Sequence, residues 1–169
     1  MSVVLVWPPP SLGRALVTTL LKEGDEVRVI VPPTEGDDYR ALGAYVATGD
    51  PFDPDLVERA CQGARTIVFA DTGGSFSGTF EPALEGARRA GVGRAIVSTA
   101  RPNRRVSEVL ANDPGDYVHL LSARGVFRKT SDEALAAAVN AADDLSGVPR
   151  TIVDLSTEEG WRALGLEPR

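Results

Sequence analysis

The sequence is poor in the residues that cross-link a chain or hold metals. Its 169 residues include one cysteine, Cys61, so no disulfide can form within the chain, and we expect a small buried apolar residue there. The one histidine, His119, has no cysteine or second histidine near it in the sequence, so no metal site is expected. Lysine and arginine number 18 against 24 acidic residues, and a net charge of −6 argues against nucleic acid as a partner.

Long apolar runs are missing as well. No stretch approaches the roughly 20 residues that span a bilayer, so no membrane partner is expected. Residues 1–6 lack a basic segment ahead of their apolar run and lead directly into prolines, unlike a signal peptide, so we expect a cytoplasmic protein. A composition of 43% apolar and 25% charged residues is typical of a globular protein. The length predicts one domain, residues 1–169.

What the sequence does contain is an alternation of short apolar runs and helical patterns. Strands are expected at residues 3–6, 27–31, 45–47, 66–70, 94–98 and 151–155. Helices are expected at residues 11–21, 37–42, 54–61, 80–90, 131–145 and 158–164. Residues 71–75 are expected to form a flexible loop, and residues 101–117 a loop with one helical piece. The alternation predicts an α/β fold with a doubly wound parallel sheet of about six strands and helices on both faces.

Single residues mark some of the expected helix ends. Asp53 should cap the helix that begins at Pro54, and Ser131 should start the alanine-rich helix that ends before Gly147. This alanine-rich helix is our candidate for the contact face of a homodimer. Ligands bind such sheets at the carboxyl ends of the strands, so function is expected in the loops after the first, fourth and fifth strands.

Several segments, in their order and spacing, carry a resemblance to a known family. They are residues 12–17, 24–31, 49–50, 63–69, 87–98 and 146–155. In these segments the chain resembles the NmrA-like and epimerase-like branch of the atypical short-chain dehydrogenase/reductase family over nearly its full length. The resemblance implies a Rossmann fold, an NAD(P) cofactor and reductase, epimerase or isomerase chemistry.

The glycine-rich turn of that family is degenerate here. Aligned on Gly13, the two earlier glycine positions of the Gly-x-x-Gly-x-x-Gly pattern hold Trp7 and Pro10. The first glycine allows a tight turn and the second lets the backbone approach the pyrophosphate, so a large ring at each position obstructs both. Residues 8–10 are all proline and have no N–H to offer an anion. The amides of Ser11, Leu12 and Gly13 at the helix start remain as vestigial cofactor contacts.

Other cofactor positions are also altered. The second strand is followed by prolines, and Glu35 is the nearest acidic residue that could bind ribose hydroxyls. Asp50 matches an aspartate that the family places near the adenine, although capping of its own turn explains it equally. Asp71 lies in the glycine-containing loop after the fourth strand, where it could line a pocket.

The catalytic pattern of the family is incomplete. Its active members use a tyrosine with a lysine four residues later, whereas Tyr117 is followed at that distance by Leu121. Ser98 lies where the resemblance implies a catalytic hydroxyl, next to Thr99, so Ser98 and Tyr117 are the only catalytic candidates.

Two functional hypotheses stay open. The favoured one is a non-catalytic Rossmann protein, with no cofactor and a cleft closed by its own turn, that acts as a binding, scaffold or regulatory subunit. The alternative is a divergent NAD(P)-dependent reductase, epimerase or isomerase with a cleft lined by Gly13, Asp50, Asp71 and Ser98. The sequence does not decide whether the protein is an enzyme.

Overall fold

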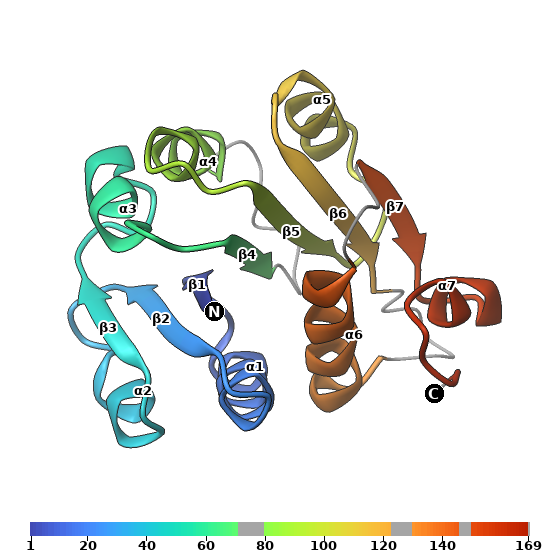
Figure 1. Cartoon of the computed structure of the whole chain (residues 1–169), viewed down its shortest axis with the longest axis horizontal. Coiled ribbons are helices and arrows are strands. Elements are labelled where there is room, and N and C mark those ends of the chain that lie inside the picture. Colours follow the sequence, from blue (N-terminus) through green and yellow to red (C-terminus); the bar gives the residue numbers. More distant parts are fainter. Residues whose placement is uncertain (71–79, 123–129, 146–149, 169) are drawn as a thin grey trace.

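The computed structural model describes residues 1–70, 80–122, 130–145 and 150–168 (Figure 1). These residues form a seven-stranded sheet in the order β3-β2-β1-β4-β5-β6-β7, and all neighbouring strands are parallel. The strands are β1 (Ser2–Val6), β2 (Glu26–Val31), β3 (Tyr45–Thr48), β4 (Thr66–Ala70), β5 (Arg94–Thr99), β6 (Asp116–Leu121) and β7 (Thr151–Asp154). The helices are α1 (Pro10–Lys22), α2 (Asp37–Ala41), α3 (Pro54–Ala60), α4 (Phe80–Arg89), α5 (Arg104–Asn112), α6 (Asp132–Asp144) and α7 (Glu158–Ala163).

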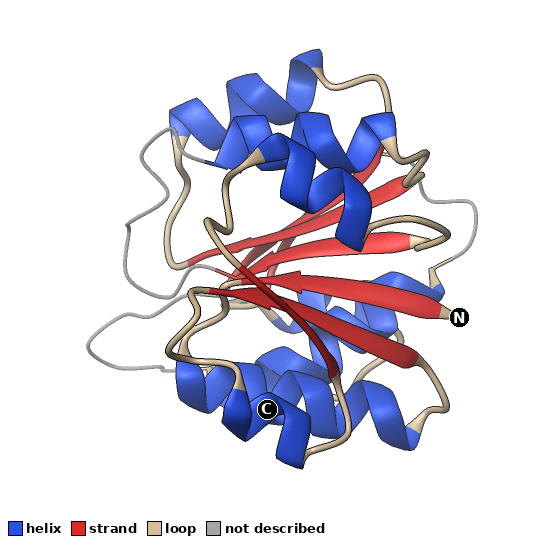
Figure 2. Cartoon of the chain, turned by 90° about the vertical axis from the view of Figure 1, so that its left-hand side faces the viewer, coloured by secondary structure: helices blue, strands red, loops and turns tan. Residues whose placement is uncertain are grey.

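Helices cover both faces of the sheet and make a three-layer sandwich (Figure 2). One core joins α1, α6 and α7 to one face, and a second core joins α3, α4 and α5 to the other. The central strands β1 and β4 are buried on both faces, because their side chains alternate between the two cores. The predicted doubly wound α/β fold is therefore confirmed.

One strand is not predicted from the sequence. The sequence pattern assigns residues 116 and 117 to a polar loop, but Asp116–Leu121 forms β6, between β5 and the strand expected to be sixth. The pattern is obscured because the strand starts with an aspartate just after Pro114 and Gly115 and carries His119 in its middle. The helical piece expected in this stretch is α5.

The helix ends agree with their expected caps. The Asp53 side chain accepts a hydrogen bond from the Asp55 amide at 3.0 Å, and the Ser131 side chain accepts one from the Ala134 amide at 3.1 Å. Gly24 follows α1 with a φ of 87°, a conformation that favours glycine. Gly147 and the loop expected at residues 71–75 lie outside the described residues.

Two further expectations concern burial. Cys61 is fully buried, as predicted, and its burial raises the pKa of the thiol to about 12. The alanine-rich helix α6 packs against α1 and buries most of its alanines within the chain, so those alanines do not form an outer contact face. A homodimer stays a prediction. No described helix is both long and apolar enough to cross a membrane.

Candidate functional site

The turn after β1 is built around Trp7. Its φ of 37° lies in the left-handed region, which bulky residues rarely adopt. The indole Nε1 donates a hydrogen bond of 2.9 Å to the Glu35 carboxylate, in the loop after β2. The ring also meets Phe52, in the loop after β3, at 6.1 Å between centroids and an interplanar angle of 62°. Trp7 therefore joins three loops at the carboxyl edge of the sheet.

The start of α1 supplies the positive groups of this edge. Pro10 is the first helical residue, and the Gly13 amide donates to the Pro9 carbonyl at 2.7 Å. In the described part of the chain no acceptor is bonded to the amides of Ser11 and Leu12, and the first turn contains no acidic residue. Two such N–H groups at the positive end of a helix suit an anion such as a phosphate.

The space beside Gly13 is filled by other side chains of the protein. A Cβ on this glycine would lie 2.3 Å from the Tyr39 hydroxyl and 2.9 Å from Pro8 Cγ. Tyr39 comes from α2, is nearly fully buried, and its hydroxyl donates to the Pro8 carbonyl at 3.4 Å. Burial and the nearby Glu35 carboxylate raise the pKa of Tyr39, so the phenol stays neutral. This packing accounts for the glycine without a ligand.

A small cavity opens beside this packing. It has a volume of about 220 Å³ and is lined by Pro10, Arg14, Thr34, Glu35, Asp37, Asp38 and Tyr39. Three carboxylates accompany one guanidinium in this lining, and Arg14 already lies 3.5 Å from the Asp38 carboxylate. The cavity is therefore net negative, in contrast to the helix start beside it.

Asp50, another sequence candidate for cofactor binding, does not line this cavity. Asp50 accepts a hydrogen bond of 2.9 Å from the Phe52 amide, so its carboxylate closes the turn that leads into α3. Asp71 lies outside the described residues. The structure thus brings Ser11, Leu12 and Gly13 together, with Asp50 two residues from the Phe52 ring that contacts Trp7.

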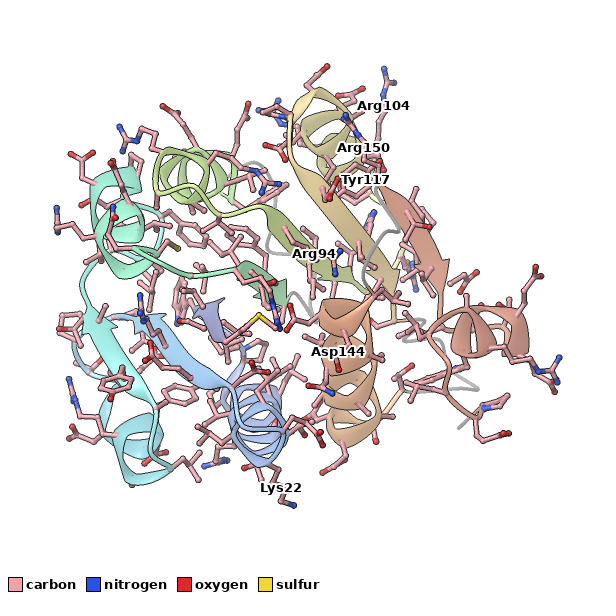
Figure 3. The ribbon with its side chains drawn as sticks, viewed as in Figure 1. Lys22, Arg94, Arg104, Tyr117, Asp144 and Arg150 are labelled. Atoms are coloured by element: carbon pink, nitrogen blue, oxygen red, sulfur yellow. The ribbon has the colours of Figure 1, made fainter. Side chains whose placement is uncertain are left out.

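The two catalytic candidates lie apart. Ser98 is next to the carboxyl end of β5 and shares a face with Ile96, whereas Tyr117 is near the amino end of β6 and packs on the opposite core. The Ser98 hydroxyl is buried without a partner among the described residues. The Tyr117 ring lies under the Arg150 guanidinium, 5.7 Å from its centroid (Figure 3). No described contact joins them into one site.

A polar pair that the sequence does not predict lies at the end of β5 and in β6. The Thr99 hydroxyl is 2.8 Å from His119 Nε2 and also donates to the Arg101 carbonyl at 2.8 Å. Because a hydroxyl has one proton, this arrangement favours the histidine tautomer whose Nε2–H donates to Thr99. Burial lowers the pKa of His119 to about 4, and its Nδ1 has no partner in the described residues. The pair could be found only once residues 116–121 are recognised as a strand.

The edge fits a dinucleotide in part. Ser11 and Leu12 can hold an anion, but the two earlier glycine positions of the turn are filled by Trp7 and Pro10. A pyrophosphate can therefore lie against the helix start, and cannot approach the backbone of residues 8–10 as it approaches a glycine-rich turn.

Comparisons with known proteins agree with this fold. A protein-family model described as NAD(P)H-binding matches residues 11–154. Three similar solved structures are the anaerobilin reductase ChuY of Escherichia coli O157:H7 (15% identity, 90% of this chain and 95% of that chain, TM-score 0.70), the NADPH-dependent quinone oxidoreductase QOR2 of Escherichia coli (15%, 99% and 76%, TM-score 0.72) and the triphenylmethane reductase of Citrobacter sp. complexed with NADP(H) (13%, 90% and 69%, TM-score 0.73). A search of curated proteins found no match.

Proposed function

We propose, on the premise that this chain belongs to the NAD(P)H-binding family, that it binds a nicotinamide dinucleotide and acts as an NAD(P)-dependent oxidoreductase. The observation that carries this proposal is the start of α1, where the amides of Ser11 and Leu12 lie at the ligand edge without a bonded acceptor in the described chain. Similar folds belong to proteins named as reductases, which favours this hypothesis over the non-catalytic one preferred from the sequence.

Different residues along the carboxyl edge would contact different parts of the ligand. The Ser11 and Leu12 amides hold diphosphate oxygens by charge-assisted hydrogen bonds, aided by the dipole of α1. Because prolines replace the rest of the turn, residues 8–10 would offer the diphosphate no N–H donor. A bound nicotinamide supplies or accepts the hydride. Toward β5, the Thr99 hydroxyl, held by His119 and the Arg101 carbonyl, is one polar group that could contact the substrate.

A second candidate function rests on Trp7. The indole contacts both Glu35 and Phe52 across the mouth of the turn, and this contact favours a non-catalytic binding, scaffold or regulatory protein whose own turn takes the place of the cofactor. The two candidates differ in whether any dinucleotide binds.

Calorimetric titration with NADH and NADPH separates them. We expect a dissociation constant in the micromolar range for at least one dinucleotide, and absence of binding by both up to millimolar concentration would favour the second candidate. Ser11→Pro deletes one N–H donor in the first turn of α1, where this N–H has no acceptor within the helix, and should weaken binding. Lys22→Gln, at the other end of α1, is the matched control and should leave binding unchanged.

Turnover is then tested by the loss of NAD(P)H absorbance. A quinone and a triphenylmethane dye are suitable first acceptors, because proteins of similar fold are named for reducing them. Oxidation of the cofactor that depends on the acceptor would support the oxidoreductase. Binding without oxidation by a wider set of carbonyl and conjugated acceptors would leave a dinucleotide-binding protein without reductase activity.

A further inference from the structure

Trp7 differs from the other large apolar side chains in where it is exposed. Its side chain is 44% exposed, whereas Phe69, Phe80 and Trp161 are at most 2% exposed. The other exposed large apolar residues of the described chain are Met1, Leu42, Tyr45 and Ile152. None of these directly follows the carboxyl end of a strand, as Trp7 follows β1. An indole is thus presented to solvent at the edge where a doubly wound sheet binds ligands.

The ring is held in place before any ligand arrives. The hydrogen bond to Glu35 fixes the Nε1 edge at 2.9 Å, and Phe52 meets the ring at a steep angle. Neither contact sandwiches the indole between two parallel surfaces, which agrees with its exposure. A rigid aromatic surface loses little conformational entropy when a flat ligand stacks on it.

The position of the ring suits one part of a dinucleotide. Trp7 contacts the loops after β2 and β3, on the β3 side of β1, while Ser98 and Thr99 lie beyond β4 on the opposite side. A dinucleotide with its diphosphate at Ser11 and Leu12 places its two rings on either side of the helix start. The ring on the β2–β3 side is the adenine, because the ribose next to it is read near the end of β2.

We propose that the exposed indole face of Trp7 stacks on the adenine ring of the dinucleotide. This proposal rests on the proposed function and assigns Trp7 as a binding residue in a position where the family pattern has glycine. Aromatic stacking then compensates for the backbone hydrogen bonds that a glycine-rich turn would give the diphosphate. It also predicts that the adenine half of the ligand contributes more to affinity than the nicotinamide half.

The test compares substitutions at Trp7 with two half-ligands, 5′-AMP and nicotinamide mononucleotide. Trp7→Ala should weaken NADH and 5′-AMP binding about tenfold or more, because loss of one base–aromatic stack has an effect of this size. Trp7→Phe keeps a ring and should stay within about threefold of the wild type. Binding of nicotinamide mononucleotide should not change. Tyr45→Ala, an exposed aromatic at the start of β3, is the matched control.

The outcomes separate the inference from the proposed function. Unchanged or tighter NADH binding by Trp7→Ala would overturn the stacking role and leave dinucleotide binding intact, and tighter binding would identify Trp7 as a plug. No binding of NADH, NADPH or 5′-AMP by the wild type would overturn both. If Trp7→Ala does not fold, quenching of the wild-type tryptophan fluorescence by iodide tests the inference instead. Iodide reaches the exposed Trp7, whereas Trp161 is buried. 5′-AMP should protect the Trp7 emission from iodide, and no protection would contradict stacking.

Discussion

The two edges of the sheet are built on different principles. At the amino edge, charged groups are paired: the buried Asp143 carboxylate accepts hydrogen bonds from Arg65 and from the Thr66 hydroxyl, and Asp25 lies 3.1 Å from the amino group of Met1. Arg94 adds hydrogen bonds to the last carbonyls of α6 (Figure 3). The contacts of Asp143 and Arg94 join β4 and β5 to α6, and the contact between Met1 and Asp25 joins the start of β1 to the start of β2.

The carboxyl edge contains more of the unpaired buried polar atoms. Trp7, directly after β1, adopts a left-handed backbone conformation, as does Arg150, which precedes β7 at the amino edge. Of the three buried side-chain polar atoms without a partner in the described chain, two, Ser98 Oγ and His119 Nδ1, lie in the carboxyl halves of β5 and β6. Such features cost stability and are found where a protein binds or reacts. The contrast fits our proposal that the carboxyl edge holds the ligand, while the paired groups of the amino edge stabilise the fold.

The largest predicted effect is on the amino edge. Asp143→Ala removes the buried partner of Arg65 and Thr66 and should lower the free energy of unfolding by about 4 kcal/mol, within the range for breaking a buried ion pair. Urea denaturation measures this loss. The neighbouring, exposed Asp144→Ala should change stability by less than about 0.5 kcal/mol. A similar loss for both variants would contradict a specific role for the Asp143 network.

The pH dependence of stability tests the carboxyl half of β6. Burial lowers the pKa of His119 from 6.5 to about 4, so the folded state favours the neutral ring. Above about pH 6.5 the neutral ring contributes fully to the free energy of unfolding. This contribution is lost as the pH falls toward 4, and the loss reaches roughly 3 kcal/mol. The difference in unfolding free energy between wild type and His119→Gln, measured from pH 7.5 to 4, should shrink by this amount. A difference that stays constant with pH would contradict the buried, neutral histidine.

Substitution of Gly13 tests the packing that occupies the turn. In Gly13→Ala the added Cβ would meet the Tyr39 ring and Pro8, at a cost of about 2 kcal/mol. Tyr39→Phe removes the nearest atom, so the same substitution should cost less in that background. Gly93→Ala, where no atom lies within 4 Å of the added carbon, should be nearly neutral in thermal unfolding. Equal costs in both backgrounds would show that Tyr39 does not limit the space at Gly13.

The smallest expected effect is on cofactor preference. The carboxylates of Glu35, Asp37 and Asp38 line the cavity beside Arg14, so they should repel the additional phosphate of NADPH. We expect NADH to bind about tenfold more tightly than NADPH, and Glu35→Gln to reduce the ratio. Glu108→Gln on α5 is the control with the same charge change. Tighter binding of NADPH than of NADH would show that the positive charge of Arg14 outweighs the three carboxylates of the cavity.

Much of the fold could be predicted because its signals are local. The alternation of apolar runs and helices, with caps such as Asp53 and Ser131, identifies most elements within a residue or two. The strand β6 was not recognised, because it starts with Asp116 just after Pro114 and Gly115 and because His119 interrupts its apolar residues.

For the candidate site, the sequence reveals only the residues that differ from the family pattern. Trp7 and Pro10 are visible in the sequence as replacements of glycine. The bond from Trp7 to Glu35 spans 28 residues, and the contact between Gly13 and Tyr39 also joins separate elements. Only the folded arrangement brings these residues together, so local pattern could not show that the turn is held by its own side chains.

The most direct test of the contrast between the two edges is an NMR titration of the labelled protein with NADH. We predict amide shift changes at residues 7, 11–14, 35–38 and 52, with no change at Asp25, Arg65 and Asp143. Such a result would place the ligand on the carboxyl edge and leave the paired amino edge unaffected. Shifts confined to the amino edge, or no shifts at millimolar NADH, would contradict this assignment.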